Sequence, residues 1–227
     1  WYLNKKNEKF VKKNASKIRI IYKSSIKYIE KFKKNNWSLI YSSINKNFFK
    51  FDFNYSINNQ KIKLIYIGRI IKYKNPINIV KSLKFNDKIY LKIIGNGNYL
   101  DVLKKVITSE NLNDRVEIIK RVENKKLYKE ICDSNICALN TLYSEFPKTL
   151  IESLATGIPV IINENNYIPE LAEENIVYQV TNNPTGYAKG IKKLICNQNL
   201  RYNIGNNGKQ YILNNLNIDK ADKIFLE

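Results

Sequence analysis

The chain has 227 residues, of which 44% are hydrophobic and 26% are charged, and its formal net charge is +19. These proportions are those of globular domains, so a hydrophobic core can form and wholesale disorder is excluded. The chain has three cysteines and no His, which excludes a mixed Cys/His zinc site and catalysis by Ser-His-Asp or Cys-His arrangements. It also has no Met, and we therefore expect a fragment whose upstream residues are missing.

The positive charge favours an anionic partner, but its distribution argues against nucleic acid. Lysines are scattered along the whole chain, and the nearest approach to clusters is in the N-terminal flank, at residues 4–17 and 23–34. A nucleic-acid interface gathers its basic residues into one patch or stripe. A basic face can still attract a phosphorylated substrate or hold the protein near an anionic membrane.

The N-terminal part predicts a strand at residues 18–22, a helix at 26–34, a second strand at 37–41 and a linker at 45–59. From residue 61 onward, short apolar runs rich in Ile, Val and Tyr alternate with longer stretches of helical periodicity. The predicted strands are 62–67, 89–94, 116–119, 136–139, 159–162 and 176–180, and the predicted helices are 76–84, 100–110, 124–132 and 147–156. Residues 183–227 predict two or three further helices, weakened by four glycines.

Repeated strand–helix units of this kind predict an α/β fold, a doubly wound parallel sheet with helices on both faces. In such sheets, ligands bind outside the carboxyl ends of the strands. Chemistry is therefore expected in the segments that follow the predicted strands.

The segment after the first of these strands carries Gly68, Arg69 and, shortly after, Lys74. Glycine lets the backbone turn and lets a ligand approach closely. The planar donor fork of Arg69 and the compact charge of Lys74 are suited to a diphosphate. The alternative is that both are solvated cations in a lysine-rich protein. After the second strand, Gly95-Asn96-Gly97 is a weaker signal, because a plain strand-to-helix turn explains it equally well and Leu100 stands where a dinucleotide fingerprint has its third Gly.

The segment 144–152 follows the fourth strand and opens a predicted helix, with Pro147 in its first turn and Gly157 just past its end. Free N–H groups at such a helix start suit a phosphate or a polar sugar. Glu152 is predicted to lie off the buried stripe and to reach the cleft, where a carboxylate can bind a cis-diol such as a ribose. Its alternative is a solvated pair with Lys148.

In order and content, these segments resemble the C-terminal domain of retaining GT-B glycosyltransferases of family 4, the group 1 type. Residues 64–69 with Lys74 resemble the family's "strand, G-R, then K-G" segment, and 92–97 resemble its "I-V-G-x-G" strand end. Residues 145–161 resemble "E-G-F-P-x-x-L-L-E-A-M-A-x-G-x-P-V-I", and 168–170 resemble the "G-G-x-P-E" that follows. The resemblance covers roughly residues 39–213.

The resemblance implies a Rossmann-like GT-B C-terminal domain at 60–195, with a partial N-terminal-domain remnant and linker at 1–59 and C-terminal helices at 196–227. It implies that Arg69 and Lys74 neutralise the leaving nucleoside diphosphate without a metal or other cofactor, and that Glu145 contacts the transferred sugar. The other donor-binding residues that it implies are Gly68, Phe146, Pro147, Lys148, Thr149, Glu152 for the ribose, and Arg121 and Val122 beside the base. These assignments require the guanidinium, the ammonium and the helix start to converge on one pocket.

One departure concerns the two glutamates of the family pattern. Seven residues usually separate them, whereas six separate Glu145 and Glu152. An ungapped alignment puts Ser144 at the first Glu position, while deletion of the following Gly restores Glu145. We favour the deletion, because a carboxylate is then still present. A loop without this Gly is stiffer, and a small misplacement can be costly in rate.

The predicted function is transfer of a sugar from a UDP- or GDP-linked donor to an acceptor hydroxyl, with retention, in glycan or polysaccharide biosynthesis. The acceptor is expected to be a glycan or a lipid-linked glycan. The predicted location is the cytoplasm, with peripheral contact to an anionic membrane surface as an option. The alternatives are a non-catalytic nucleotide-sugar-binding or interaction module with a degenerate site, a nucleic-acid or membrane-surface binder driven by charge, and a UDP-sugar epimerase on the same scaffold.

Overall fold

The computed structural model describes residues 18–20, 37–39, 44–57, 60–142, 147–164, 171 and 174–215. Contacts divide the chain into two compact units, one of Trp1–Ser43 with Asn215–Glu227 and one of Ile44–Asn214. In the smaller unit, β1 (Ile18–Ile20) and β2 (Trp37–Leu39) form a parallel pair. The helix predicted at 26–34 lies outside the described residues. The predicted domains at 1–59, 60–195 and 196–227 stay a prediction.

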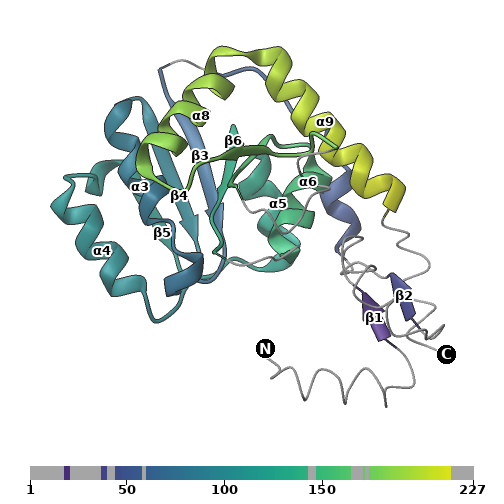
Figure 1. The fold of residues 1–227 in the computed structure, drawn as a ribbon, viewed down its shortest axis with the longest axis horizontal. Coiled ribbons are helices and arrows are strands. Elements are labelled where there is room, and N and C mark those ends of the chain that lie inside the picture. The colour runs from purple at the N-terminus through teal and green to yellow at the C-terminus, as the bar shows by residue number, and fades with distance from the viewer. Residues whose placement is uncertain are drawn as a thin grey trace. The chain divides into compact units, whose positions relative to one another are not determined.

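The larger unit is built on a six-stranded sheet in which every pairing is parallel. Its strands are β3 (Ile62–Ile67), β4 (Ile89–Ile94), β5 (Val116–Ile119), β6 (Ile136–Leu139), β7 (Val160–Asn163) and β8 (Tyr178–Val180). The spatial order is β5-β4-β3-β6-β7-β8 (Figure 1), the order of doubly wound nucleotide-binding sheets. This confirms the predicted fold class. The strand order reverses between β3 and β6, so a crevice is expected at their carboxyl ends.

Helices cover both faces of this sheet, as Figure 1 shows. The helices are α3 (Ile77–Ser82), α4 (Leu100–Ser109), α5 (Asn124–Cys132), α6 (Lys148–Thr156), α8 (Pro184–Cys196) and α9 (Gln198–Asn215). Because alternate strand residues face opposite sides, Leu64 and Tyr66 join a core with Ile79, Leu103 and Ile191 from α3, α4 and α8. On the other face, α5 and α6 pack against each other, and α6 packs against β7.

Several predicted boundaries shift by short distances. The helix predicted at 76–84 divides into α3 and the 3-10 turn Leu83–Phe85. Helix α6 begins at Lys148, so Pro147 is its N-cap and not part of its first turn, while Gly157 ends it with a left-handed φ of 81° as expected of a C-terminal glycine. Within the described residues, no helix is both long and apolar enough to cross a membrane.

The segment predicted as a linker, 45–59, belongs to the larger unit and packs within it where it is described. Phe48, in the 3-10 helix Lys46–Phe49, is fully buried. The Tyr55 hydroxyl donates to the Gly157 carbonyl over 3.0 Å, and the Arg201 guanidinium of α9 donates to the Tyr55 carbonyl over 2.7 Å. A Cβ on Gly205 would lie 2.1 Å from the Gly157 carbonyl oxygen. The glycine in α9 therefore permits this close approach, which offsets its weak helical propensity.

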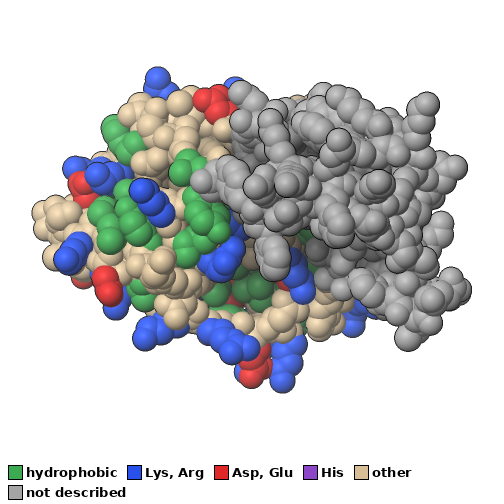
Figure 2. All heavy atoms as spheres, turned by 60° about the horizontal axis from the view of Figure 1, so that its bottom comes forward, with side chains coloured by type: hydrophobic (Ala, Val, Ile, Leu, Met, Phe, Trp, Pro, Cys, Tyr) green, Lys and Arg blue, Asp and Glu red, His purple; other side chains and the backbone are tan. Residues whose placement is uncertain are grey.

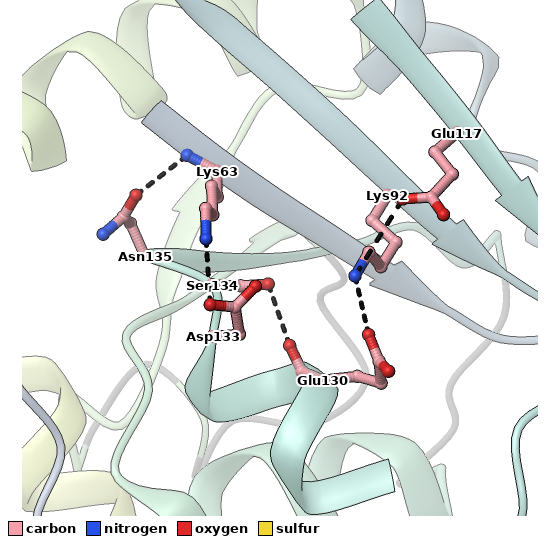
Figure 3. Close-up of polar contacts among 7 residues, drawn as sticks. All are labelled: Lys63, Lys92, Glu117, Glu130, Asp133, Ser134 and Asn135. Atoms are coloured by element: carbon pink, nitrogen blue, oxygen red, sulfur yellow. Dashed lines mark hydrogen bonds and ion pairs between the residues drawn. The ribbon is translucent and has the colours of Figure 1, made fainter. Parts of the chain in front are cut away.

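Charged side chains connect α5 and the turn after it to strands β3 and β4 of the sheet (Figure 3). Lys92 on β4 lies 2.6 Å from the Glu130 carboxylate and 3.9 Å from that of Glu117. Lys63 on β3 lies 2.8 Å from Asp133. The hydrogen bond to Glu130 raises the pKa of Lys92 above its ordinary value. A hollow of about 520 Å³ borders this cluster, so the amino end of the sheet carries paired charges around an open space.

Candidate functional site

A cavity of about 230 Å³ lies at the carboxyl ends of β3 and β6, where the strand order reverses. Doubly wound sheets bind their ligands at this position. Its lining consists of Tyr66, Ile67, Gly68, Arg69, Lys74, Leu139, Asn140, Thr141, Pro147, Lys148, Thr149 and Ile162. The structure thus brings Arg69, Lys74 and the start of α6 to one pocket, the convergence that the sequence assignment required.

Three cations border the cavity. Arg69 follows β3 and is exposed, with its Nη2 3.4 Å from the Tyr73 hydroxyl. Lys74 is half-buried and ends the 3-10 helix Lys72–Lys74, whereas Lys148 is exposed at the first position of α6. No carboxylate is found among the described residues that line the cavity. The pocket therefore has the charge that an anionic ligand requires.

The N-terminus of α6 adds to this positive potential. Pro147 has an extended backbone, with φ −68° and ψ 147°, and its carbonyl accepts the N–H groups of Leu150 and Ile151. The N–H groups at Lys148 and Thr149 precede the first intrahelical hydrogen bonds, so the helix itself supplies no acceptor for them. Both residues line the cavity. This is the usual way in which a helix start binds phosphate.

On one face of the molecule, the positive charge is dispersed. On the face that Figure 2 shows, the described Lys and Arg side chains are spread among hydrophobic and polar ones and gather into no single stripe. The scatter along the sequence is thus also a scatter over this surface. The basic residues that share a cavity are therefore the informative ones.

Glu152 corrects one sequence prediction. It was expected off the buried stripe of α6, but its exposed fraction is 2%, because residues 150–156 of this helix are all buried. Its Oε1 accepts a hydrogen bond from Asn124 Nδ2 over 2.8 Å and lies 3.9 Å from Lys148 Nζ. Burial raises the pKa of the Glu152 carboxyl, although the Asn124 hydrogen bond and the Lys148 charge oppose this. The pair with Lys148 exists, but the carboxylate is not solvated, and Glu152 does not line the cavity.

The loop assigned to the base lies after β5. Arg121 there is exposed and Val122 half-buried, and neither lines the cavity. The loop continues into α5, whose N-cap is Glu123, and Glu123 makes no side-chain cap bond. The Asn124 side chain reaches Glu152, so it ties this loop to α6 beside the cavity.

Two assigned residues, Glu145 and Phe146, lie outside the described residues. The remaining glycine assignment, Gly68, lines the cavity, and a Cβ there would lie 3.2 Å from the Tyr66 hydroxyl. The structure also reveals polar residues that the sequence analysis did not single out. Asn163 at the end of β7 accepts from Thr141 N–H over 2.9 Å and donates to its carbonyl over 2.7 Å, which fixes one wall of the cavity.

Comparison with known proteins adds to this geometry. The model of the family described as Glycosyl transferases group 1 matches residues 47–211. An uncharacterized glycosyltransferase of Methanocaldococcus jannaschii is 29% identical over 172 residues, which cover 72% of this chain and 43% of that protein. The amylovoran biosynthesis glycosyltransferase of Erwinia amylovora is 26% identical over 128 residues, 52% of this chain and 31% of the relative.

Among solved structures, HepE of Anabaena, in complex with UDP and glucose, is similar in fold. Its TM-score is 0.79 at 14% sequence identity, over 99% of this chain and 67% of that one. The chain spans about half the length of the curated relatives that it matches. The likeness therefore concerns one half of such proteins.

Proposed function

The chain belongs to the group 1 glycosyl transferases, and from this premise we propose that it is the donor-binding part of an enzyme that transfers a sugar from a nucleoside diphosphate sugar to an acceptor hydroxyl. The observation that carries the proposal is the cavity at the strand-order reversal, where Arg69, Lys74 and the start of α6 meet. A diphosphate placed there would face three cations and the free N–H groups of a helix.

The proposed chemistry follows from how charge develops in the reaction. The bond between the anomeric carbon and the phosphate oxygen breaks, so negative charge grows on the leaving diphosphate and positive character on the sugar ring. Arg69, Lys74 and the α6 N-terminus would stabilise that negative charge, in a geometry fixed before the reaction. These groups neutralise the leaving group without a metal, and we propose, by family resemblance, that the anomeric configuration is retained.

The other assignments stay proposals of the same kind. Glu145 would support the positive character of the sugar, with Phe146 beside it. Glu152 would bind the ribose, which requires its carboxylate to leave the contact with Asn124 or to act together with it. Arg121 and Val122 would lie against the base. UDP bound to the similar fold of HepE supports UDP as the first donor nucleotide to test, and GDP is the second.

The acceptor and the location are also part of the proposal. The relative in amylovoran biosynthesis favours a glycan acceptor in polysaccharide synthesis. All three cysteines are unpaired, as is usual in a reducing compartment, and this supports a cytoplasmic location. Contact with an anionic membrane would draw on the net charge of +19.

A non-catalytic nucleotide-sugar-binding module is the second candidate, because six residues instead of seven separate Glu145 and Glu152. Inserting Gly after Glu145 in the complete protein separates the two. A gain of transfer activity on insertion indicates a decayed enzyme, whereas activity of the unaltered protein rejects the non-catalytic role.

The decisive experiment is a calorimetric titration of the chain with UDP and with GDP, in the presence and absence of EDTA. We expect saturable binding of one nucleotide that EDTA does not change. Arg69→Ala should weaken it by about 10- to 100-fold, since hydrogen bonds to charged groups contribute roughly 1.5–3 kcal/mol. No saturable binding up to millimolar concentrations, or equal binding by the variant, would reject the site.

A further inference from the structure

The short turn that carries Lys74 is held by three hydrogen bonds from outside it. The carbonyls of Tyr73, Lys74 and Asn75 are consecutive, and each accepts a different donor. Leu142 N–H donates to the first over 2.9 Å, the Tyr66 hydroxyl donates to the second, and Asn140 Nδ2 donates to the third over 2.7 Å. We call these three donors the clasp.

The turn has little rigidity of its own. It is a 3-10 helix of three residues, Lys72–Lys74, between the extended residues Ile71 and Asn75. Its own hydrogen bonds run from Lys74 N–H to the Ile71 carbonyl over 2.9 Å and from Asn75 Nδ2 to the Lys72 carbonyl over 2.6 Å. Such short 3-10 turns have poor hydrogen-bond geometry. The position of Lys74 therefore depends also on the bonds that Tyr66 of β3 and the residues after β6 make to the carbonyls of this turn.

The two side chains of the clasp come from the rigid part of the fold. Tyr66 is the fifth residue of β3 and 1% exposed, and its hydroxyl also lies 3.2 Å from the Arg69 carbonyl. Burial raises the pKa of this hydroxyl above its ordinary value, so it stays protonated and remains a donor. The buried Tyr66 hydroxyl thus lies between the backbone carbonyls of Arg69 and Lys74, the two residues assigned to the diphosphate.

Asn140 directly follows β6 and is 7% exposed. Because the Asn75 carbonyl can only accept, the amide atom facing it must be Nδ2, which fixes the orientation of the amide. Its Oδ1 is buried and has no hydrogen-bond partner among the described residues. A buried acceptor without a donor destabilises the folded state, because its desolvation is not compensated. An apolar side chain of similar size would remove this unsatisfied acceptor but would leave the Asn75 carbonyl without its donor, so the amide serves the bond to the turn.

We propose that Tyr66 and Asn140 are positioning residues. Their hydrogen bonds to the carbonyls of Lys74 and Asn75 fix the backbone of the turn, and with it the position of the Lys74 ammonium at the donor cavity. This inference rests on the proposed function. Neither side chain needs to touch the ligand. They act through Lys74, whose long flexible side chain can reach the diphosphate consistently only when its backbone is fixed.

The test is a double-mutant cycle on the full chain, read by titration with UDP or GDP, whichever the wild type binds. Tyr66→Phe and Asn140→Leu should each weaken nucleotide binding by about three- to tenfold. In a Lys74→Ala background, each should weaken it by less than about twofold, because the residue through which they act is gone. Thermal denaturation of every variant reports whether the fold is kept.

Tyr55→Phe is the matched control, since it also removes a tyrosine hydroxyl that donates to a backbone carbonyl, but at the far end of α6. It should leave nucleotide affinity unchanged. Equal losses with and without Lys74, or no loss in both single variants, would overturn the inference while leaving the proposed function intact. Failure of the wild type to bind either nucleotide rejects the proposed function and, with it, the clasp's role.

Discussion

The two ends of the parallel sheet hold the same kinds of charged side chain in opposite surroundings. Lys63 and Lys92 line the hollow toward the amino end, and they lie 2.8 and 2.6 Å from carboxylates. At the carboxyl end, Arg69, Lys74 and Lys148 border a cavity with no carboxylate among its described lining residues, and the carboxylate nearest to Lys148, that of Glu152 at 3.9 Å, does not line it. Both ends are hollowed, and the amino-end hollow is the larger. The comparison teaches that a candidate site for an anionic ligand is better recognised by the absence of carboxylates around its cations than by the size of the hollow.

The largest expected effect comes from removing one lysine at each end. Lys74→Met should weaken UDP or GDP binding by about 10- to 100-fold, because it removes a charge that would contact the diphosphate. Lys63→Met makes the same change beside Asp133 and should leave nucleotide affinity unchanged. Calorimetric titration of both variants measures the difference. Equal losses would show that the nucleotide responds to net charge only, and would break the comparison.

Next in size is the stability that the amino-end pairs supply. Lys92→Met leaves the Glu130 carboxylate, which is 29% exposed, without its partner. We expect the free energy of unfolding to fall by about 1–3 kcal/mol. Lys63→Met breaks a more exposed pair and should cost less than about 1 kcal/mol. Urea denaturation distinguishes the two, and a larger loss at Lys63 would contradict the role assigned to burial.

The smallest effect concerns Glu152, whose nearest described cation is 3.9 Å away, against 2.6 Å for Glu130. Because burial raises the pKa of Glu152, the folded state favours its protonated form. The stability that this form contributes is present at acid pH and lost as pH rises through the folded pKa. Glu152→Gln should therefore gain up to about 1 kcal/mol at pH 7 and little at pH 4.

The matched control for that experiment is Glu130→Gln, which should lose stability at pH 7 because Lys92 then loses the nearer of its two carboxylate partners and keeps only Glu117 at 3.9 Å. Denaturation curves at several pH values measure both variants. A Glu152→Gln gain that grows toward acid pH would contradict the direction of the pKa shift. Weaker UDP binding by this stabilised variant would support a role for Glu152 at the ribose.

Much of this architecture could be predicted from the sequence, because buried parallel strands are nearly continuous apolar runs. The bounds of β3, β4, β5 and β6 match the predicted ranges. The position of Arg69 and Lys74 at the cavity also followed, since the end of a strand in such a sheet is known once its direction is known.

The polar interior of the site could not be predicted in the same way. Tyr66 and Asn140 stand within or beside apolar strand residues, so periodicity assigns them to the core. Their hydroxyl and amide acquire a role only when the turn at Lys74, which is distant from Asn140 in sequence, is brought beside them. Glu152 was misplaced because a helix covered on all sides has no polar face, and its neighbours are not visible from one helix's own pattern.

The glycines at 95 and 97 limit which substitutions the loop after β4 can accept. A Cβ on Gly95 would lie 1.9 Å from the Gly68 carbonyl oxygen, and one on Gly97 would lie 2.3 Å from that of Ile70. The loops after β3 and β4 are thus stacked backbone on backbone, also through a 2.9 Å hydrogen bond from Ile70 N–H to the Asn96 carbonyl. A single added methyl group on the second loop would displace the first, and with it Arg69. A substitution at Gly95 or Gly97 lies outside the cavity, yet we expect it to displace Arg69 from the cavity lining.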